Sequence, residues 1–269
     1  MFKWLVRLII LSVAFYVGYV VIYPFTVDVS SLKRKNPQIT AMMKFRMKQW
    51  QEEGKKIQIK KHWVSIDRIS PYLVKAVLIG EDDKFYKHSG FDLEGIKKAI
   101  EKDIREKKLK YGGSTITQQL AKNLYLSPSK NPVRKIQEAI ITWRIEKTLT
   151  KKRILELYLN IAEWGEGIFG AEAAARHYFG KSASELAPME AARLAAALPN
   201  PIKYSPVGNS KFIEKRASLI YFIMQKRGII KEEYTDTEKG ETEATVREGV
   251  SDGDKPVNDT QKPDQSPSK

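Results

Sequence analysis

Three consecutive acidic residues at positions 81–83 follow a segment with the apolar spacing of a buried helix. In residues 71–80 the apolar side chains recur at three- and four-residue steps, and Val77 belongs to that stripe. Glu81 comes four residues after Val77, so a helix that continues places Glu81 on the same inward face. A carboxylate there loses part of its water and meets the negative end of the helix dipole, and both effects raise its pKa. Such a group is suited to act as a general base.

The acidic triplet also has a simpler interpretation, a solvated acidic end of a helix, which is the commoner situation for neighbouring carboxylates. Phe85, His88 and Gly90 follow within the same stretch. His88 has no second histidine near it in the sequence, so a metal site is not indicated there. Residues 81–90 alone therefore leave two alternatives, a general base and a solvated surface.

A second polar stretch, residues 112–123, begins with two glycines and continues Ser-Thr-Ile-Thr-Gln-Gln. Thr115 and Gln118 have the spacing of a capping box, in which two side chains satisfy backbone groups at the start of a helix. Capping is therefore the structural explanation of Thr115. Gln118 and Lys122 are four residues apart and share a helical face, so an amide and an ammonium can point at one ligand.

A third stretch begins with a loop, in which Asn131 and Pro132 are placed as the N-cap and the first residue of a helix. The sequence predicts that this helix covers residues 133–149. Arg134 and Glu138 lie four residues apart on one face of it. An exposed salt bridge is the ordinary explanation of such a pair.

Helices must position most of these groups, because few segments alternate with the period of two that is typical of strands. The predicted fold class is therefore mainly α. Further helices are expected at 91–110, 150–161, 171–179, 185–198 and 211–227, and one short strand at 62–66.

The N-terminal region has the composition of a membrane anchor. Residues 8–23 carry no charge, and with the apolar residues before them they make about 20 residues, enough to cross a bilayer core. Lys3 and Arg7 lie near one end, where they can reach the headgroups. A cleaved signal peptide is the alternative, but no small-x-small cleavage site follows, so we expect an uncleaved anchor over 1–24. Basic residues on both sides leave its orientation open, and the basic, apolar segment 25–62 can rest on a membrane or pack against the domain.

The net charge of +15 is unevenly distributed. Residues 231–269 carry 6 basic and 11 acidic residues and almost no large apolar ones, which predicts a disordered acidic tail. The remaining 230 residues carry 41 basic and 21 acidic residues, a net charge of +20. A body this basic indicates an anionic partner, which can be nucleic acid, a phospholipid surface or a phosphorylated substrate. The absence of cysteine excludes disulfides, thiolate metal sites and a cysteine nucleophile.

Together these stretches resemble the glycosyltransferase domain of peptidoglycan polymerases, glycosyltransferase family 51, over about residues 63–207. Five ordered motifs carry the resemblance. They are Glu-Asp-x-x-Phe-x-x-His-x-Gly at 81–90, Gly-Gly-Ser-Thr-Ile-Thr-Gln-Gln at 112–119 with Lys-Asn at 122–123, Arg-Lys-x-x-Glu at 134–138, Ile-Leu-Glu-x-Tyr-Leu-Asn at 154–160 and Tyr-Phe-Gly-Lys at 178–181. The monofunctional branch with a single N-terminal anchor resembles the chain best. The Lys-Thr-Gly motif of the transpeptidase domain is absent, so we expect no transpeptidase.

The resemblance implies a lysozyme-like helical glycosyltransferase domain over 63–230. It implies that Glu81 is the general base and that Glu138 is a second essential carboxylate. Cations that stabilise a leaving pyrophosphate would be Lys122, Lys130, Arg134 and Lys135, of which Lys130 is assigned by spacing only. Side chains that line the sugar and pyrophosphate subsites would be Ser114, Thr115, Gln118, Gln119 and Asn123. Residues that shape the loop holding the base would be Asp82, Phe85, His88 and Gly90.

The resemblance further implies that lipid II is the acceptor and the growing lipid-linked glycan the donor. A direct displacement would then form a β-1,4 glycan with inversion and release undecaprenyl pyrophosphate. No covalently bound cofactor is implied, and a divalent cation, magnesium or manganese, is expected near the pyrophosphate. The expected location is the inner (cytoplasmic) membrane, with one span, a cytoplasmic N-terminus and a periplasmic catalytic domain. Expected partners are the membrane and proteins of cell-wall synthesis or division, and no nucleic acid.

Two alternatives fit parts of the same pattern. A membrane-anchored lytic glycosidase would cleave finished glycan, since paired carboxylates also serve glycoside hydrolysis. A non-enzymatic membrane-bound module would use the basic body to bind nucleic acid or assembly partners, although no nucleic-acid-binding motif is present.

Overall fold

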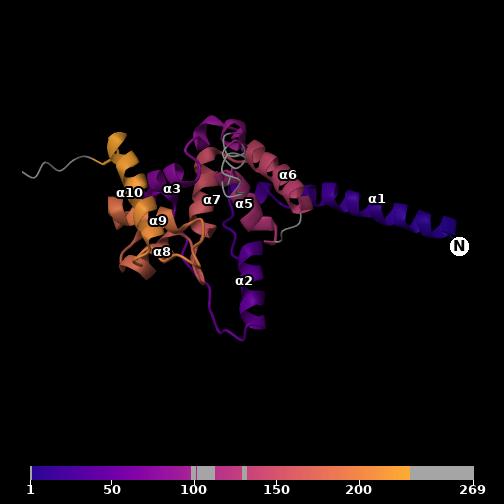
Figure 1. The fold of residues 1–269 in the computed structure, drawn as a ribbon, viewed down its shortest axis with the longest axis horizontal. Coiled ribbons are helices and arrows are strands. Elements are labelled where there is room, and N and C mark those ends of the chain that lie inside the picture. Colours follow the sequence, from indigo (N-terminus) through magenta and orange to yellow (C-terminus); the bar gives the residue numbers. More distant parts are fainter. Residues whose placement is uncertain (1, 98–100, 102–112, 129–131, 231–269) are drawn as a thin grey trace, which may run out of the picture. The chain divides into compact units, whose positions relative to one another are not determined.

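The computed structural model describes residues 2–97, 101, 113–128 and 132–230, and these residues are mainly helical (Figure 1). The α-helices are α1 (Phe2–Thr26), α2 (Ala41–Glu52), α3 (Pro71–Glu81), α5 (Ile116–Tyr125), α6 (Pro132–Thr148), α7 (Lys151–Ile161), α8 (Ala171–Phe179), α9 (Pro188–Ala197) and α10 (Lys211–Lys226). Short 3-10 helices cover Ser30–Lys33, Ile66–Arg68, Phe85–Lys87 and Ala183–Glu185. The expected acidic tail, Lys130 and Asn131 lie outside the described residues.

Helix α1 has the length and composition of a membrane span. Its 25 residues extend about 37 Å at 1.5 Å per residue, against about 30 Å for a bilayer core. Almost all its side chains are exposed, and among the described residues it is the one helix long and apolar enough to cross a membrane. These observations are consistent with the expected anchor.

Polar contacts join the end of α1 to the domain, where it meets α6 (Figure 1). Arg144 of α6 donates hydrogen bonds to the backbone carbonyls of Pro24 and Val27. The hydroxyl of Tyr23 donates to the carbonyl of Tyr125 at 2.8 Å. Burial raises the pKa of Tyr125 to about 12, so its hydroxyl stays protonated and donates to the carbonyl of Asp28 at 2.9 Å. The anchor helix is therefore attached to the domain by direct contacts at its C-terminal end.

The core joins two groups of helices. Helix α9 packs against α3 and α10, and α5 packs against α6 and α7. The buried face of α9 consists mostly of alanines, including Ala191, Ala192, Ala195 and Ala196, all 0% exposed. Small side chains let neighbouring backbones approach closely, so α9 packs tightly against both α3 and α10, which also contact each other. This is the tightly packed helix expected from the small apolar residues at 185–198, and it begins three residues later, at Pro188.

A small three-stranded sheet lies beside α2. Strand β3 (Ile168–Phe169) pairs in parallel with β1 (Lys60–Lys61) and antiparallel with β2 (Glu163–Gly165). Phe169 packs in a second small core against Met43 and Trp50 of α2. One apolar face of the juxtamembrane segment therefore packs on the domain, which was one of its two expected arrangements.

The strand predicted at 62–66 is wrong in position. The paired residues are Lys60 and Lys61, and a 3-10 helix already begins at Ile66. Between them, the side-chain amide of Asn160 accepts from the backbone N–H of Val64 at 2.9 Å and donates to its carbonyl at 2.8 Å. A side chain thus satisfies the backbone groups that a neighbouring strand would have satisfied. The predicted helices agree with the structure within a few residues, except that 91–110 is described as helical only at 93–97 and 101.

Candidate active site

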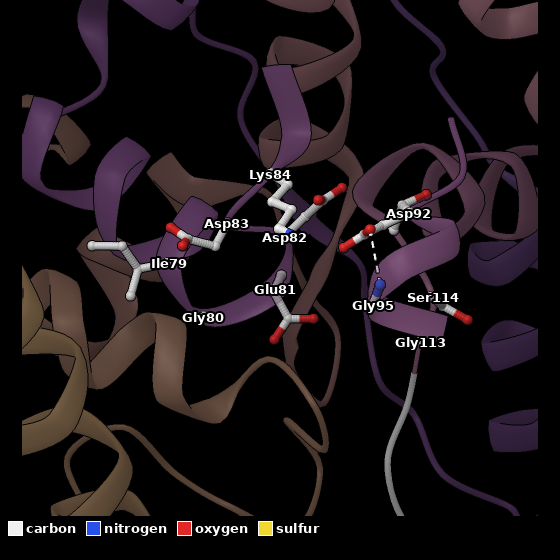
Figure 2. Close-up of a pocket in the computed structure, with 11 residues that line it drawn as sticks. Ile79, Gly80, Glu81, Asp82, Asp83, Lys84, Asp92, Gly95, Gly113 and Ser114 are labelled. Atoms are coloured by element: carbon white, nitrogen blue, oxygen red, sulfur yellow. Dashed lines mark hydrogen bonds between the residues drawn. The ribbon is translucent and has the colours of Figure 1, made fainter. Parts of the chain in front are cut away.

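Glu81 is the last residue of α3, and its side chain is only 9% exposed. The prediction that the helix continues to Glu81 and turns it inward is therefore confirmed. Its carboxylate points to the opposite side of the chain from Asp82 and Asp83, which separates it from the other two acidic residues (Figure 2). A cavity of about 290 Å³ lies beside Glu81 and is bordered on its far side by Gly113, Ser114 and Thr115.

Two side chains hold the Glu81 carboxylate. The amide of Gln119 in α5 donates to Oε2 at 2.9 Å, and Arg216 in α10 donates to Oε1 at 3.2 Å. Arg216 also donates to the carbonyl of Gly80 at 2.7 Å. The hydroxyl of Tyr158 donates to the Gln119 carbonyl oxygen at 3.1 Å, which turns the amide N–H₂ toward Glu81. Three helices therefore fix the position of one carboxylate.

Burial raises the pKa of the Glu81 carboxyl above its ordinary value. The hydrogen bonds from Gln119 and Arg216 and the charges of Arg216 and Lys122 oppose this effect. The direction agrees with the expectation from the sequence, and the cause is mainly the loss of water. A desolvated carboxylate of raised basicity, held by two donors, has the properties of a general base.

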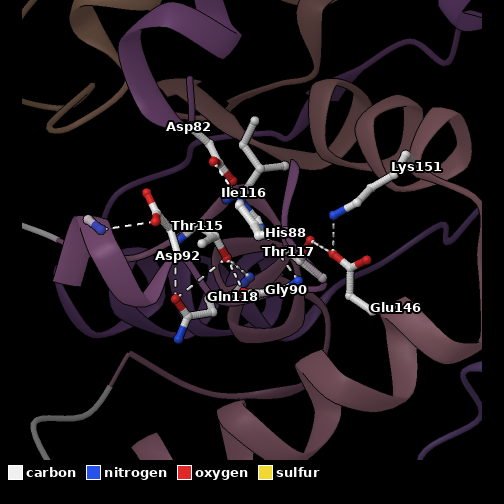
Figure 3. A network of polar contacts seen from close by, with 11 residues as sticks. Asp82, His88, Gly90, Asp92, Thr115, Ile116, Thr117, Gln118, Glu146 and Lys151 are labelled. Atoms are coloured by element: carbon white, nitrogen blue, oxygen red, sulfur yellow. Dashed lines mark hydrogen bonds and ion pairs between the residues drawn. The ribbon is translucent and has the colours of Figure 1, made fainter. Parts of the chain in front are cut away.

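The residues after Glu81 form a closed hydrogen-bonded loop (Figure 3). The backbone N–H of Gly90 donates to Nδ1 of His88, so the ring proton lies on Nε2, which donates to Asp82 at 2.8 Å. The other oxygen of Asp82 accepts from the backbone N–H of Ile116 at 3.0 Å. Asp82 thus joins the loop after α3 to the start of α5, and Phe85 lies beneath it, 0% exposed. This arrangement supports the expected role of these residues in holding Glu81.

Gly90 is confined both by its backbone and by its neighbours. Its φ is +94°, and a Cβ there would lie 2.9 Å from Thr142 Cγ2 and from Glu146 Cγ. We expect Gly90→Ala to lower the free energy of unfolding by about 1–3 kcal/mol through backbone strain and overpacking. Gly54→Ala is the matched control, since Gly54 has φ +69° with nothing within 4 Å. Chemical denaturation of both variants separates the two causes, and equal losses would show that the neighbours of Gly90 are not the reason for glycine.

Thr115 and Gln118 form the capping box that their spacing predicts. The Thr115 hydroxyl accepts a hydrogen bond from the backbone N–H of Gln118 at 3.2 Å. The side-chain oxygen of Gln118, Oε1, accepts one from the backbone N–H of Thr115 at 3.0 Å. The Thr115 hydroxyl also donates to the carbonyl of Gly90 at 2.7 Å. Both side chains are nearly buried, so here they hold the start of α5, and their expected contact with substrate stays a prediction. The neighbouring amide, Gln119, is the one that reaches Glu81.

A cluster of charged residues lies within the electrostatic reach of the Glu81 carboxylate. Glu138 on α6 is 2% exposed, and both its oxygens accept hydrogen bonds, from Arg134 and from Lys135. Lys135 also donates to the hydroxyl of Ser114 at 3.3 Å. Burial lowers the pKa of Lys122, and the charges of Arg134 and Lys135 lower it further, whereas Glu138 and Glu81 raise it. Lys122 therefore lies within the electrostatic reach of both carboxylates.

The expected divalent cation does not fit these residues as they are arranged. Glu138, the second carboxylate that the motifs indicate, already has a cation on each oxygen. Across the described ranges no group of three or more histidine, cysteine or acidic side chains is placed to hold a metal ion. We therefore derive no step of the reaction through a metal.

The site thus brings together most of the residues predicted from the motifs. Glu81, Gln119 and Lys122 form one group, and Glu138, Arg134 and Lys135 form the adjoining one. Asn123 lines a second cavity that shares Gln119 and Lys122, while Lys130 lies outside the described residues. Sequence reasoning missed Arg216 and Tyr158 as partners of the Glu81 site. Arg216 lies 135 positions away on an amphipathic helix, and no local pattern marks it.

A buried carboxylate of raised pKa, a carboxamide and a cluster of cations on a helical domain are typical of an enzyme that transfers groups between polar, anionic substrates. Comparison with known proteins makes this class specific. The family model described as Transglycosylase matches residues 48–225, more than half of the chain. The chain belongs to this transglycosylase family, and it is a glycosyltransferase of peptidoglycan biosynthesis that polymerises glycan strands.

Relatives agree with this assignment. The chain is 43% identical over 220 residues to a biosynthetic peptidoglycan transglycosylase of Nitrosospira multiformis, covering 81% of this chain and 94% of the relative. It is 42% identical over 222 residues to one of Laribacter hongkongensis, covering 82% and 96%. It is 54% identical over 169 residues to one of Aromatoleum aromaticum, covering 63% and 74%.

Proposed function

We propose that this glycosyltransferase uses lipid II as the acceptor and the growing lipid-linked glycan as the donor. The acceptor hydroxyl attacks the anomeric carbon of the donor sugar, a new β-1,4 bond forms with inversion, and undecaprenyl pyrophosphate leaves. The observation that supports this most is the buried Glu81 carboxylate, held by Gln119 and Arg216 beside the charge of Lys122.

In this proposal Glu81 takes the proton of the attacking hydroxyl. Its raised pKa makes it a stronger base than an ordinary glutamate, and the hydrogen bonds from Gln119 and Arg216 favour its ionised form. The proton leaves the hydroxyl as the new C–O bond forms, so the oxygen does not carry a full positive charge. One positioned base is sufficient for this half of the reaction.

The leaving pyrophosphate gains negative charge as the old glycosidic bond breaks. Lys122, Arg134 and Lys135 supply positive charge on the side of the site next to Glu138, and Ser114 is hydrogen-bonded to this group. Cations that are already in position stabilise a developing anion without reorganisation. Glu138 keeps Arg134 and Lys135 in position, and Lys130 is proposed to add a further charge.

The membrane location follows from the same chemistry, because both substrates and the by-product carry a polyprenyl chain. We propose that α1 anchors the enzyme in the inner membrane with its N-terminus in the cytoplasm and the catalytic domain in the periplasm. Proteins of cell-wall synthesis or division are proposed as partners on that side. The divalent cation remains a prediction from resemblance, with no ligands assigned.

Incubating the full-length protein with lipid II in liposomes tests the substrate. We expect lysozyme-sensitive polymer and free undecaprenyl pyrophosphate, with the new β-1,4 linkage visible by NMR of the undigested polymer. A parallel incubation with isolated sacculi tests the opposite activity. Release of soluble muropeptides from sacculi, without polymer from lipid II, would replace the proposal by a lytic glycosidase.

A further inference from the structure

A second cavity of about 200 Å³ adjoins the Glu81 site. It shares Gln119 and Lys122 with that site, and Tyr158, which orients Gln119, also borders it. Its other borders come from α2, from the chain after α7 and from residues 198–202. The Gln119 carboxamide therefore connects the Glu81 carboxylate to the second cavity, and a ligand that extends from the base past Gln119 enters this cavity.

Glu163 on β2 borders this second cavity, and one of its carboxylate oxygens is unsatisfied. The residue is 9% exposed, and its Oε2 accepts from Nε of Arg46 at 2.9 Å. Its Oε1 is buried and has no hydrogen-bond partner among the described residues. Buried carboxylate oxygens are nearly always hydrogen-bonded, because they have given up water. The ion pair with Arg46, which joins α2 to β2, satisfies Oε2 but gives no hydrogen-bond donor to Oε1.

The surroundings decide which donor fits Oε1. Arg46 and Lys122 already place positive charge in the cavity, so a substrate ammonium would be repelled. An ionised phosphate has no proton to donate to Oε1, so it would leave this oxygen unsatisfied. Amides of Gln119, Asn123 and Asn200 line the remaining wall, next to apolar side chains of Met42, Pro199 and Ile202. Neutral hydroxyl and acetamido groups on a sugar ring match such a mixture of hydrogen-bonding and apolar surface.

We propose that Glu163, held in place by Arg46, is a sugar-binding residue next to the reacting centre. Its Oε1 accepts a hydrogen bond from a hydroxyl or acetamido N–H of an N-acetylated sugar unit that adjoins the unit reacting at Glu81. The inference rests on the proposed function, since it names a subsite for the same substrate. Through Arg46, it also makes α2, the helix nearest in sequence to the anchor, part of the substrate site.

Glu163→Gln tests this subsite with little change of shape. The glutamine oxygen can still accept from Arg46, which places an N–H₂ donor where the ligand needs an acceptor. We expect the KM for lipid II to rise about 10-fold to 100-fold, as for loss of a hydrogen bond to a charged group, with kcat changed less than about 3-fold. Glu166→Gln is the matched control, because Glu166 lies in the same β2–β3 turn and its partner is the half-exposed Lys55.

A second measurement does not depend on turnover. Saturation-transfer NMR with the N-acetylglucosamine–N-acetylmuramic acid disaccharide, free of lipid and phosphate, reports binding directly. We expect signals at the acetamido groups with the wild type and Glu166→Gln, and weaker ones with Glu163→Gln. Thermal unfolding of all three proteins shows whether each is folded.

The outcomes separate this inference from the proposed function. If the wild type polymerises lipid II and Glu163→Gln has an unchanged KM and unchanged disaccharide signals, the subsite is wrong and the proposed function stands. If the wild type does not use lipid II but binds the disaccharide through Glu163, the subsite stands and the proposed function fails. A fall in kcat alone would assign Glu163 a role in holding the fold, against the inference.

Discussion

Replacing Glu81 by glutamine is expected to lower the rate of glycan polymerisation by about 10³-fold or more, within the range for loss of a general base. Glutamine keeps the size of the side chain and an acceptor for Arg216, but it cannot take a proton from the attacking hydroxyl. The expected effect is therefore on kcat, with a smaller change in KM.

The same substitution is expected to leave the stability of the domain unchanged or slightly higher. Burial raises the pKa of Glu81 in the folded state above that in the unfolded state. Its contribution to stability is therefore fully present below the unfolded pKa and is lost as pH rises through the folded pKa. In the folded state the ionised carboxylate carries a cost of desolvation, and a neutral amide removes this cost.

Glu172→Gln is the matched control for Glu81→Gln. Glu172 is 3% exposed, and its oxygens accept from Arg176 at 2.7 Å and from the backbone N–H of Ala183 at 2.7 Å. We expect this variant to lose stability and keep activity at temperatures where it is folded, the reverse of Glu81→Gln. Measuring turnover and the midpoint of thermal unfolding for both variants checks the pair. More than about a tenth of wild-type turnover in Glu81→Gln would remove Glu81 from the role of base.

Replacing Lys122 is expected to have the second largest effect. Lys122→Ala removes a cation that interacts electrostatically with both carboxylates, and we expect kcat/KM for lipid II to fall about 10²-fold to 10³-fold, as for loss of one preorganised charge-stabilising group. Lys75→Ala is the control, because Lys75 is an exposed lysine on the same helix as Glu81. Unchanged kinetics in Lys122→Ala would exclude the leaving-group role.

The pH profile distinguishes a charge-stabilising lysine from a structural one. Burial and the neighbouring cations lower the pKa of Lys122, so the wild-type rate is expected to fall on the alkaline side below the ordinary lysine range. On the acid side the rate should fall above the ordinary glutamate range, because the pKa of Glu81 is raised. Lys122→Arg keeps the charge at all these pH values, so its alkaline limb should move upward while the acid limb stays. If the alkaline limb does not move in Lys122→Arg, the ionisation that causes this fall in rate belongs to a residue other than Lys122.

The sequence predicts the helices well because their signals are local. The apolar stripe of α3, the capping box of Thr115 and Gln118 and the proline at the start of α6 all act within one or two turns. The predicted strand at 62–66 failed because its partner is the side chain of Asn160, almost a hundred positions away. No local pattern carries that information.

The residues of the candidate site also fall into two groups, those that a local pattern identifies and those that it does not. The motifs identify Glu81, Lys122 and Glu138 as residues that could act together, and the fold brings them within electrostatic reach of one another. Arg216 and Glu163 have no such pattern, since a single arginine on an amphipathic helix and a single glutamate in a short strand have no local feature that separates them from ordinary surface residues. Their roles depend on burial and on partners more than a hundred positions distant.

The direct attachment of α1 to the domain has a kinetic consequence. With Arg144, Tyr23 and Tyr125 fixing the end of the helix, no flexible tether separates a membrane-spanning α1 from the domain. An enzyme attached in this way meets a lipid-linked substrate by diffusion in two dimensions, so its rate depends on molecules per unit of bilayer area. If inert phospholipid is added while the bulk concentrations of enzyme and substrate stay constant, both become more dilute in the bilayer, and the reaction would then slow.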